Sequence, residues 1–337
     1  MTTPLPFLIL RTEEARGLVS AEDAIAATEA AWRDYGVHRG VLSRPSSHSL
    51  RGEGCVFKVK GGVLPSQGVA GFRLVADAPR DDGGEDTQDW FWLADPRTGR
   101  PVALIEEFWL HLLRTTATGA LAARMLARPG CRVAAIIGAG RIAAEMLAPL
   151  RAALPGIEEI RVSARRSASA DAFVAQHATA CPGLRAAPSV REAVAGADLV
   201  LTMTAAMEPF LDASMPARGA TVIGLGDIEM APDMLTSWAD RFVLDDLDFA
   251  TVAGSVSGWI ASGAMDREQV AARLDADVGE LATGAKPGRR DPSENVLAIV
   301  QGMAICDLAL AAAAHRAALA RGLGLRLDLG MPGLASG

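Results

Sequence analysis

The chain has 337 residues, half of them hydrophobic, which is enough for two domains with sizeable cores. A net charge of −7, with acids and bases dispersed, argues against nucleic acid or an anionic membrane as the main partner. No apolar run could span a bilayer and no signal-peptide pattern opens the chain, so we expect a cytoplasmic protein. The four cysteines show neither CxxC nor Cys/His spacing, so no metal site is expected.

The N-terminal part alternates short elements with turns. An apolar patch around residues 5–10 predicts a first strand, and Ser20–Gly36 reads as an amphipathic helix with a serine N-cap. Between Val41 and Ala94, short alternating runs separated by Gly, Pro and Asp predict antiparallel strands and hairpins. The acidic, glycine-rich segment Arg80–Asp89 is expected to be an exposed loop within this region.

The second half of the chain shows a different pattern of predicted elements. A turn at Pro96–Gly99 leads into a strand, and Phe108–Ala127 predicts a long helix. After Arg128–Arg132 strands and helices alternate, which indicates a parallel sheet with crossover helices. The expected strands are residues 133–138, 158–164, 197–204, 220–226 and 241–246, and the expected helices are 143–154, 169–180, 189–197, 231–239 and 302–324.

Lysine is rare in this chain. Lys58, Lys60 and Lys286 are the only lysines among 33 Lys and Arg residues. The spacing of the first two places both side chains on one face of a strand. An ammonium can give up a proton and a guanidinium effectively cannot, so a chemical role is open, as is a solvated sheet edge.

The run "IIGAGRIAA" carries the clearest motif. Gly138, Gly140 and Ala143 form the pattern GxGxxA between a predicted strand and a predicted helix, where a dinucleotide-binding turn requires it. Gly140 lets the backbone approach a pyrophosphate, and the helix start at Arg141 and Ile142 offers unpaired N–H groups. The alternative is a plain strand-to-helix corner.

The end of the next strand indicates which cofactor is preferred. NAD sites usually carry an acid there for the ribose hydroxyls, but this strand ends at Ser163 and is followed by Arg165 and Arg166. Guanidiniums and hydroxyls suit a 2′-phosphate, so we predict NADP(H) in preference to NAD(H). Ordinary surface arginines are the alternative.

The segments "LLRTTATGALAARMLA", "VAAIIGAGRIAAEML", "LVLTMTA", "VIGLGD" and "GMAICDLALA" together resemble the ornithine cyclodeaminase/mu-crystallin family, over residues 21–325. The resemblance implies an α/β fold, with a central Rossmann-type domain of doubly wound parallel sheet at residues 128–307. This domain would be inserted in an α+β domain for substrate binding and dimerisation, made of residues 1–127 and 308–337. It also implies a homodimer.

The same resemblance assigns substrate residues. Arg114 in "RTTA" and Arg44 in "LSRPSSHS" match arginines that hold the substrate carboxylate, and Asp227 in "GLGD" matches the acid that cyclodeaminases use as general acid/base. A guanidinium in the apolar stretch around Arg114 also needs an anion if it is buried. His48 and His111 have no identifiable partner in the sequence and are read as surface or core histidines.

The family lysine is the main departure. Aligning Pro65 with the family turn places Arg73 where the substrate-binding lysine should be, and Lys60 then reaches in from the neighbouring strand. An alternative alignment makes Lys58 the family lysine. We prefer the first, and an arginine there weakens any transfer of the cyclodeaminase mechanism, because it cannot act as a neutral base.

Further cofactor positions carry over from the family. Thr115, Thr202 and Thr204 would contact the cofactor, the last two beside the ribose and nicotinamide, and Val296 and Gly302 would approach the nicotinamide ring. Gln301 stands where the family has serine.

The function that follows is an NADP(H)-dependent oxidoreductase that moves a hydride to or from the nitrogen-bearing carbon of a small amino or imino (ketimine) acid. Lys60 would polarise or protonate the substrate, and Asp227 would handle the proton on nitrogen or water. The alternatives are an ammonia-releasing cyclodeaminase with bound NAD and a non-catalytic NADPH-binding protein.

Overall fold

The computed structural model describes residues 6–79 and 85–329, which form two compact units. The first unit takes the chain up to Arg114 and again from Met303, and the second takes Thr115–Gly302. Both boundaries lie earlier in the chain than the expected ones at 127/128 and 307/308. The first falls inside α3 (Phe108–Leu126), which therefore contributes to both units.

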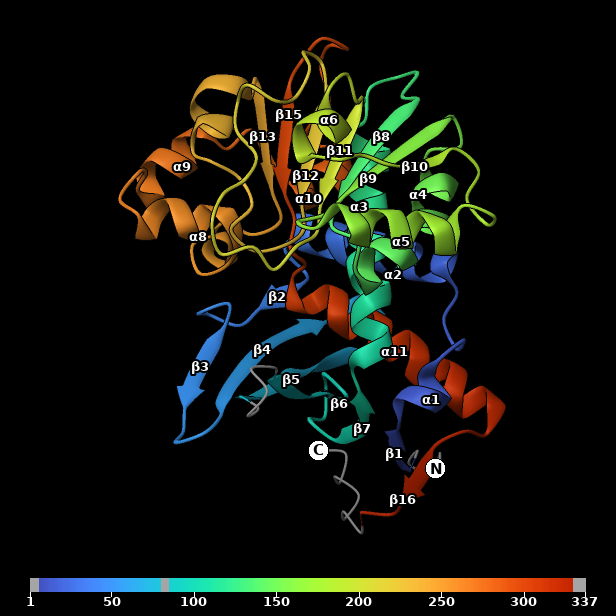
Figure 1. Ribbon diagram of the computed structural model, residues 1–337. Helices are drawn as coiled ribbons and strands as arrows, with labels where there is room; N and C mark the ends of the chain where they lie inside the picture. Colours follow the sequence, from blue (N-terminus) through green and yellow to red (C-terminus); the bar gives the residue numbers. More distant parts are fainter. Residues whose placement is uncertain (1–5, 80–84, 330–337) are drawn as a thin grey trace. The chain divides into compact units, whose positions relative to one another are not determined.

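The first unit is built on a mixed sheet, in the order β16-β1-β7-β6-β5-β4-β2 with β3 also paired to β4 (Figure 1). Its strands β2–β7 pair antiparallel, as the alternating pattern predicts. The elements are β1 (Phe7–Leu10), α1 (Thr12–Ala15), α2 (Ala21–Gly36), β2 (Val41–Leu42), β3 (His48–Arg51), β4 (Val56–Leu64), the 3₁₀ turn Pro65–Gln67, β5 (Val69–Pro79), β6 (Glu85–Ala94), β7 (Pro101–Glu106), α11 (Ala304–Arg321) and β16 (Leu325–Leu327).

Glycines on two neighbouring strands let α11 approach one face of this sheet. A Cβ on Gly62 would lie 2.8 Å from the Ile305 side chain, and one on Gly71 would lie 3.2 Å from Leu308. The predicted α2 also forms, with the Ser20 hydroxyl accepting a hydrogen bond from the Asp23 amide. The C-terminal helix thus covers the face of the sheet that carries Arg73.

The prediction of a loop at Arg80–Asp89 is wrong for residues 85–89. Residues 85–89 open β6 and pair with the end of β5, with Glu85 opposite Pro79 and Asp89 opposite Val75. Polar side chains are accommodated here because residues 86–88 are exposed. Residues 80–84 lie outside the described part of the chain.

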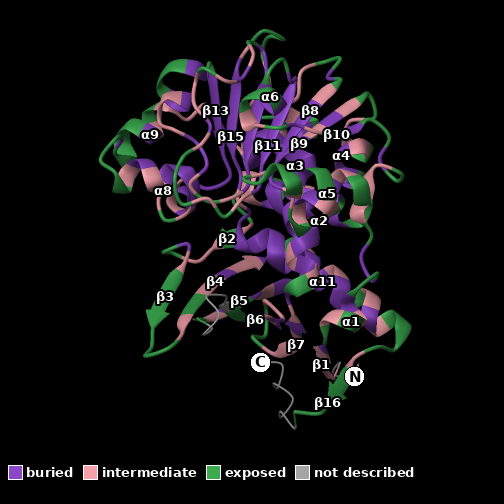
Figure 2. Ribbon diagram, in the orientation of Figure 1, coloured by how far each residue is buried: buried purple, intermediate pink, exposed green. Residues whose placement is uncertain are grey.

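The second unit is a parallel sheet in the order β10-β9-β8-β11-β12-β15-β13-β14, and its strands are buried almost throughout (Figure 2). The elements are β8 (Val133–Ile137), α4 (Arg141–Ala153), β9 (Glu159–Ser163), α5 (Ser167–His177), β10 (Leu184–Ala186), α6 (Val190–Val194), β11 (Leu199–Thr202), β12 (Thr221–Gly224), the π turn Met234–Trp238, β13 (Arg241–Leu244), α7 (Leu247–Ala250), α8 (Gly254–Ala261), α9 (Arg267–Arg273), β14 (Ala276–Asp277), α10 (Val278–Thr283) and β15 (Val296–Ile299).

Several features of this unit differ from the sequence prediction. The predicted helix at 231–239 is a shorter π-helix, Met234–Trp238, and β15, which was not predicted, lies between β12 and β13. The four residues of β15 are fully buried and apolar, so they lack the alternation that marks a half-buried strand. The helices α7–α10 were also not predicted.

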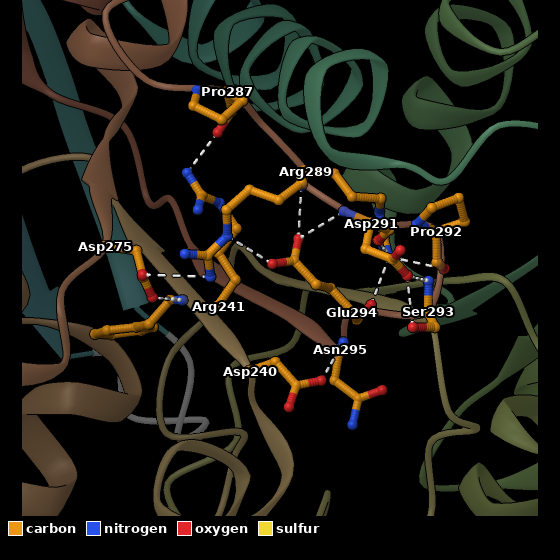
Figure 3. Close-up of polar contacts among 12 residues, drawn as sticks. Asp240, Arg241, Asp275, Pro287, Arg289, Asp291, Pro292, Ser293, Glu294 and Asn295 are labelled. Carbon is orange, nitrogen blue, oxygen red and sulfur yellow. Dashed lines mark hydrogen bonds and ion pairs between the residues drawn. The ribbon is translucent and has the colours of Figure 1, made fainter.

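A polar network secures the amino ends of the central strands (Figure 3). Arg241, at the start of β13, donates to the Pro287 carbonyl, and Asn295, just before β15, receives a backbone hydrogen bond on Oδ1 from Gly219. Arg289 donates to the Thr221 hydroxyl at 2.7 Å and to the Leu126 carbonyl at 3.2 Å. Because Arg241 and Arg289 bind groups of their own unit, we infer that this edge of the sheet has a structural role.

None of the helices in the described residues combines the length and the apolar composition needed to cross a bilayer. The cytoplasmic location expected from the sequence stays a prediction.

Candidate active site

The carboxyl ends of five strands meet at one edge of the second unit's sheet. Ile137 pairs with Ser163 on one side and with Thr202 on the other, and the row continues from Gly224 to Ile299. Ligands of open parallel sheets bind at this edge. The predicted residues that the structure brings together there are Gly138, Gly140, Arg141, Ile142, Ser163, Arg165, Arg166, Thr202, Thr204, Asp227 and Gly302.

The glycine turn has the geometry that the motif requires. Gly138 has a φ of 120°, and a Cβ there would lie 2.9 Å from the Met203 carbonyl, so no side chain fits. Gly140 is the N-cap of the 13-residue α4 and brings no capping side chain to its first turn. A Cβ on Gly140 would meet nothing within 4 Å among the described residues, so there is open space beside the start of α4. A pyrophosphate fits this arrangement.

The end of β9 supplies polar groups for the nucleoside. The Ser163 hydroxyl is buried and has no hydrogen-bond partner among the described residues. Arg165 and Arg166 are exposed, and their guanidiniums make no hydrogen bond or ion pair within the part of the chain described. A buried hydroxyl without a partner beside two uncommitted cations suits a ribose and its phosphate.

Glu229 organises the loops after β11 and β12, and sequence reasoning missed it. Its carboxylate accepts hydrogen bonds from the Thr202 hydroxyl (2.5 Å), the Thr204 amide (2.6 Å) and hydroxyl (2.8 Å), and the Gly226 amide (3.1 Å). Burial raises the pKa of Glu229 to about 7 against these four donors. Both threonine hydroxyls are thus engaged inside the protein. A glutamate in the apolar run after "GLGD" was the available signal.

Asp227 ends the loop that Glu229 secures. Its amide donates to the Thr204 carbonyl at 3.0 Å, and its carbonyl accepts from the Ser255 hydroxyl at 3.3 Å. Both contacts use the backbone, which fixes the loop while the side chain remains on the exposed surface of the unit. A carboxylate in this place can exchange protons with a ligand or water.

The segment before α11 is held by a second buried acid. Asp245 accepts a hydrogen bond from the Gly302 amide at 2.7 Å, and burial raises its pKa to about 6. The Gln301 side chain donates to the Gly226 carbonyl at 2.8 Å and so links this segment to the loop of Asp227. Val296 is not part of this edge, because it begins β15 at the opposite end, paired with Thr221. Thr115 is buried in α3, directly after Arg114.

The predicted substrate residues lie in the first unit. Lys60 on β4 is directly opposite Arg73 on β5, so the two cations share one face of the sheet. Lys58 is more exposed and forms an ion pair with Asp77 at 2.8 Å, which is the geometry of a solvated edge. Arg44 is exposed and donates to the Ser46 hydroxyl at 2.8 Å. His48 lies exposed on β3.

A buried charge network connects the two arginines of this unit. Arg73 donates from Nε and Nη2 to the two carboxylate oxygens of Glu107, at 2.6 and 2.5 Å. Arg114 donates from Nε to Asp307 at 2.7 Å and from Nη2 to Nδ1 of His111 at 2.9 Å. Sequence reasoning missed Glu107 and Asp307 and set His111 aside. Among the described residues no cluster of side chains could hold a metal ion.

Known proteins resemble this chain over nearly its whole length. The family model for the ornithine cyclodeaminase/mu-crystallin family matches residues 8–321. The chain belongs to this family. An alanine dehydrogenase from Archaeoglobus fulgidus is 29% identical over 333 residues, which is 95% of this chain and 98% of that protein. A Delta(1)-pyrroline-2-carboxylate reductase from Bacillus cereus is 25% identical over 95% of this chain and 99% of its own.

Solved structures of the family share the fold. A dimeric archaeal alanine dehydrogenase with bound NAD superposes with a TM-score of 0.86 at 28% identity, covering 96% of this chain and all of its own. That structure and this chain therefore share the fold over nearly their whole length.

Proposed function

We propose that this protein is an NAD(P)(H)-dependent oxidoreductase that acts on the nitrogen-bearing carbon of a small amino or imino acid. The observation that carries the proposal is the strand-end edge that combines the open glycine turn at α4 with the carboxylate of Asp227. The similar alanine dehydrogenase and pyrroline-2-carboxylate reductase support the class of substrate. A bound nicotinamide would supply or accept the hydride.

The residues of the chain would do the rest. Arg114 and Arg44 bind the substrate carboxylate, and Arg73 adds a third fixed positive charge. Asp227 gives or takes the proton on nitrogen or on water, while Lys60 polarises the substrate. Because Arg73 holds its proton, a cyclodeaminase reaction that needs a neutral lysine is less well supported by these residues.

The test is a panel of acids assayed with NADPH and NADH in parallel. Δ1-pyrroline-2-carboxylate, Δ1-piperideine-2-carboxylate, and pyruvate with ammonia would each be followed by loss of absorbance of the reduced cofactor. We expect at least one acid to be reduced to its amino acid. No oxidation of either cofactor across the panel would overturn the proposal, and ammonia release from ornithine or lysine without net oxidation would favour the cyclodeaminase.

We further propose that NADP(H) is the preferred cofactor. The support is the uncommitted pair Arg165 and Arg166 beside the buried hydroxyl of Ser163. Replacing both arginines with alanine is expected to lower kcat/KM for NADPH about tenfold or more, the size of one lost charged hydrogen bond, and to leave that for NADH within about threefold. A wild-type preference for NADH would refute this assignment.

A homodimer is also proposed, through the face of the first unit's sheet that α11 does not cover. Side chains alternate along strands, so Phe72 and Leu74 point away from the face that carries Arg73, and Trp92 stacks on Phe72 with ring centroids 5.8 Å apart. Phe72 is 43% exposed and Phe57 is 47% exposed. Large exposed apolar faces of this kind usually meet a partner.

Sedimentation velocity tests the dimer. Phe72→Glu is expected to convert the dimer to monomer, since it places a charge in the centre of the apolar face. Val37→Glu, at an exposed position after α2, is the matched control and should leave the mass unchanged. A wild-type monomer, or a Phe72→Glu variant that stays dimeric, would contradict the proposal.

A further inference from the structure

The side chain of Glu107 has no assigned role, although it is the most enclosed acid of the first unit's charge network. It follows β7 and precedes α3, and it is fully buried. Its amide donates to the Asp89 carbonyl at 2.9 Å, so the backbone on its N-terminal side is held by β6. A buried carboxylate needs a cation or several donors, and here the principal cation is Arg73.

The contact between Glu107 and Arg73 is bidentate. Two parallel N–H···O bonds of 2.6 and 2.5 Å fix the plane of the guanidinium as well as its position. Although burial opposes the charge, the Glu107 carboxylate raises the pKa of Arg73 above its ordinary value, so the guanidinium stays protonated. Asp89 lies 3.7 Å from the same guanidinium and makes no second pair of this kind.

The geometry leaves part of Arg73 for a ligand. Glu107 takes Nε and Nη2, and among the described residues Nη1 forms no hydrogen bond. Arg73 is also directly opposite Lys60 in the sheet register. A planar guanidinium held on one edge presents its remaining donors in a fixed direction, which a flexible lysine in the same place could not do.

Glu107 also reaches the second arginine. Its Oε1 lies 3.2 Å from Nδ1 of His111, and the same nitrogen accepts the hydrogen bond from Arg114 Nη2 at 2.9 Å. Asp307 holds Arg114 from Nε. The Glu107 carboxylate therefore binds Arg73 directly and lies next to His111, which accepts a hydrogen bond from Arg114.

We propose that Glu107 is a positioning residue for the substrate carboxylate: it clamps Arg73 in one orientation, and the clamp replaces the titratable lysine of the family pattern with a fixed positive charge. This inference rests on the proposed function, because Arg73 is taken to bind the substrate. It adds a residue whose effect would be seen in substrate binding while the cofactor and the chemical step are little affected.

The experiment compares Glu107→Gln with Asp89→Asn. Both variants replace a carboxyl group next to Arg73 with an amide, but only the first breaks the bidentate pair. Burial raises the pKa of Asp89 to about 7, so its neutralisation removes only part of a charge at neutral pH. For the acid reduced most efficiently in the panel, Glu107→Gln should raise KM about tenfold or more and change kcat and the KM for the cofactor less than threefold. Asp89→Asn should change all three less than threefold.

A double-variant cycle with Arg73→Met shows whether Glu107 acts through Arg73. If it does, Arg73→Met/Glu107→Gln should raise KM no further than Arg73→Met alone. Additive effects, or a Glu107→Gln variant with the KM of the wild type, would overturn the inference while the proposed function stands. If Glu107→Gln does not fold, Glu107→Asp keeps the charge but shortens the reach, and it should show the same selective rise in KM.

Calorimetry distinguishes a failure of the inference about Glu107 from a failure of the proposed function. If the wild type turns over none of the panel acids, their binding is titrated directly into wild type and Glu107→Gln in the presence of NADPH. Weaker binding to the variant supports the clamp without any activity, and equal affinity overturns it. No binding to the wild type overturns both the clamp and the proposed function.

Discussion

Replacing Asp227 by asparagine should lower kcat by about 10²–10⁴-fold, the range of a lost general acid or base. Asparagine has nearly the same shape, and two contacts that help to fix this loop use the Asp227 backbone, at the Thr204 carbonyl and the Ser255 hydroxyl. The variant should therefore fold and bind cofactor as the wild type does. Steady-state assays with the best acid of the panel measure kcat, and calorimetry with NADPH measures binding.

The control for Asp227→Asn is Asp171→Asn, which removes another exposed carboxylate, on α5, and should change nothing. Full turnover by Asp227→Asn would remove Asp227 from the proton transfer. A wild type that binds NADPH tightly and shows no turnover, together with an Asp227→Asn variant indistinguishable from it, would favour the non-catalytic reading. The loss of kcat with cofactor binding intact distinguishes an enzyme from a binding protein.

The parts of the fold that could be predicted depend on local pattern. The alternation of strands and helices after residue 132 indicates the parallel sheet, and the turn at Gly138 and Gly140 indicates the edge at which we propose that a ligand binds. The place of β15 could not be predicted in this way, because four buried apolar residues carry no period and their neighbours β12 and β13 are set by tertiary packing.

The same distinction applies to the candidate site. Motifs point to Arg114 and Asp227 because each lies in a recognisable short phrase. The acids that hold the two arginines do not lie in such motifs. Asp307, the partner of Arg114, is 193 residues from it in sequence, and Glu107, the partner of Arg73, is 34 residues from it. A buried acid is visible in a sequence only as an acid in an apolar stretch, and its partner appears only when the chain has folded.

The register of β4 and β5 also bears on the choice between lysines. Lys58 forms its ion pair with Asp77 at the exposed end of the hairpin, whereas Lys60 lies opposite Arg73. The alignment that puts Arg73 at the family lysine position is therefore compatible with a cation pair on one face, and the alternative would put the substrate lysine in a solvated ion pair. This favours the assignment of Lys60 and Arg73 in the proposed function.

The second large effect is expected from Gly140→Val, which should weaken binding of NADPH and NADH by at least about a hundredfold, equivalent to about 2.8 kcal/mol. Gly140 has φ −97° and ψ −170°, which a valine can adopt, and apart from its two chain neighbours no described residue has an atom within 4 Å of the added Cβ. Stability should fall by no more than about 1 kcal/mol, the scale of an N-cap change. The new side chain would occupy the space that the pyrophosphate needs at the start of α4.

Gly138→Ala is the matched control, because Gly138, the first glycine of the same motif, is needed for the fold. At φ 120° and 2.9 Å from the Met203 carbonyl, the alanine should lower the free energy of unfolding by about 1–3 kcal/mol. Calorimetry and thermal unfolding of both variants separate the two roles of one turn. A Gly140→Val protein that binds cofactor as tightly as the wild type would show that the phosphates lie elsewhere. The proposed function would then fail too, because it places Asp227 beside a cofactor whose phosphates bind at the start of α4.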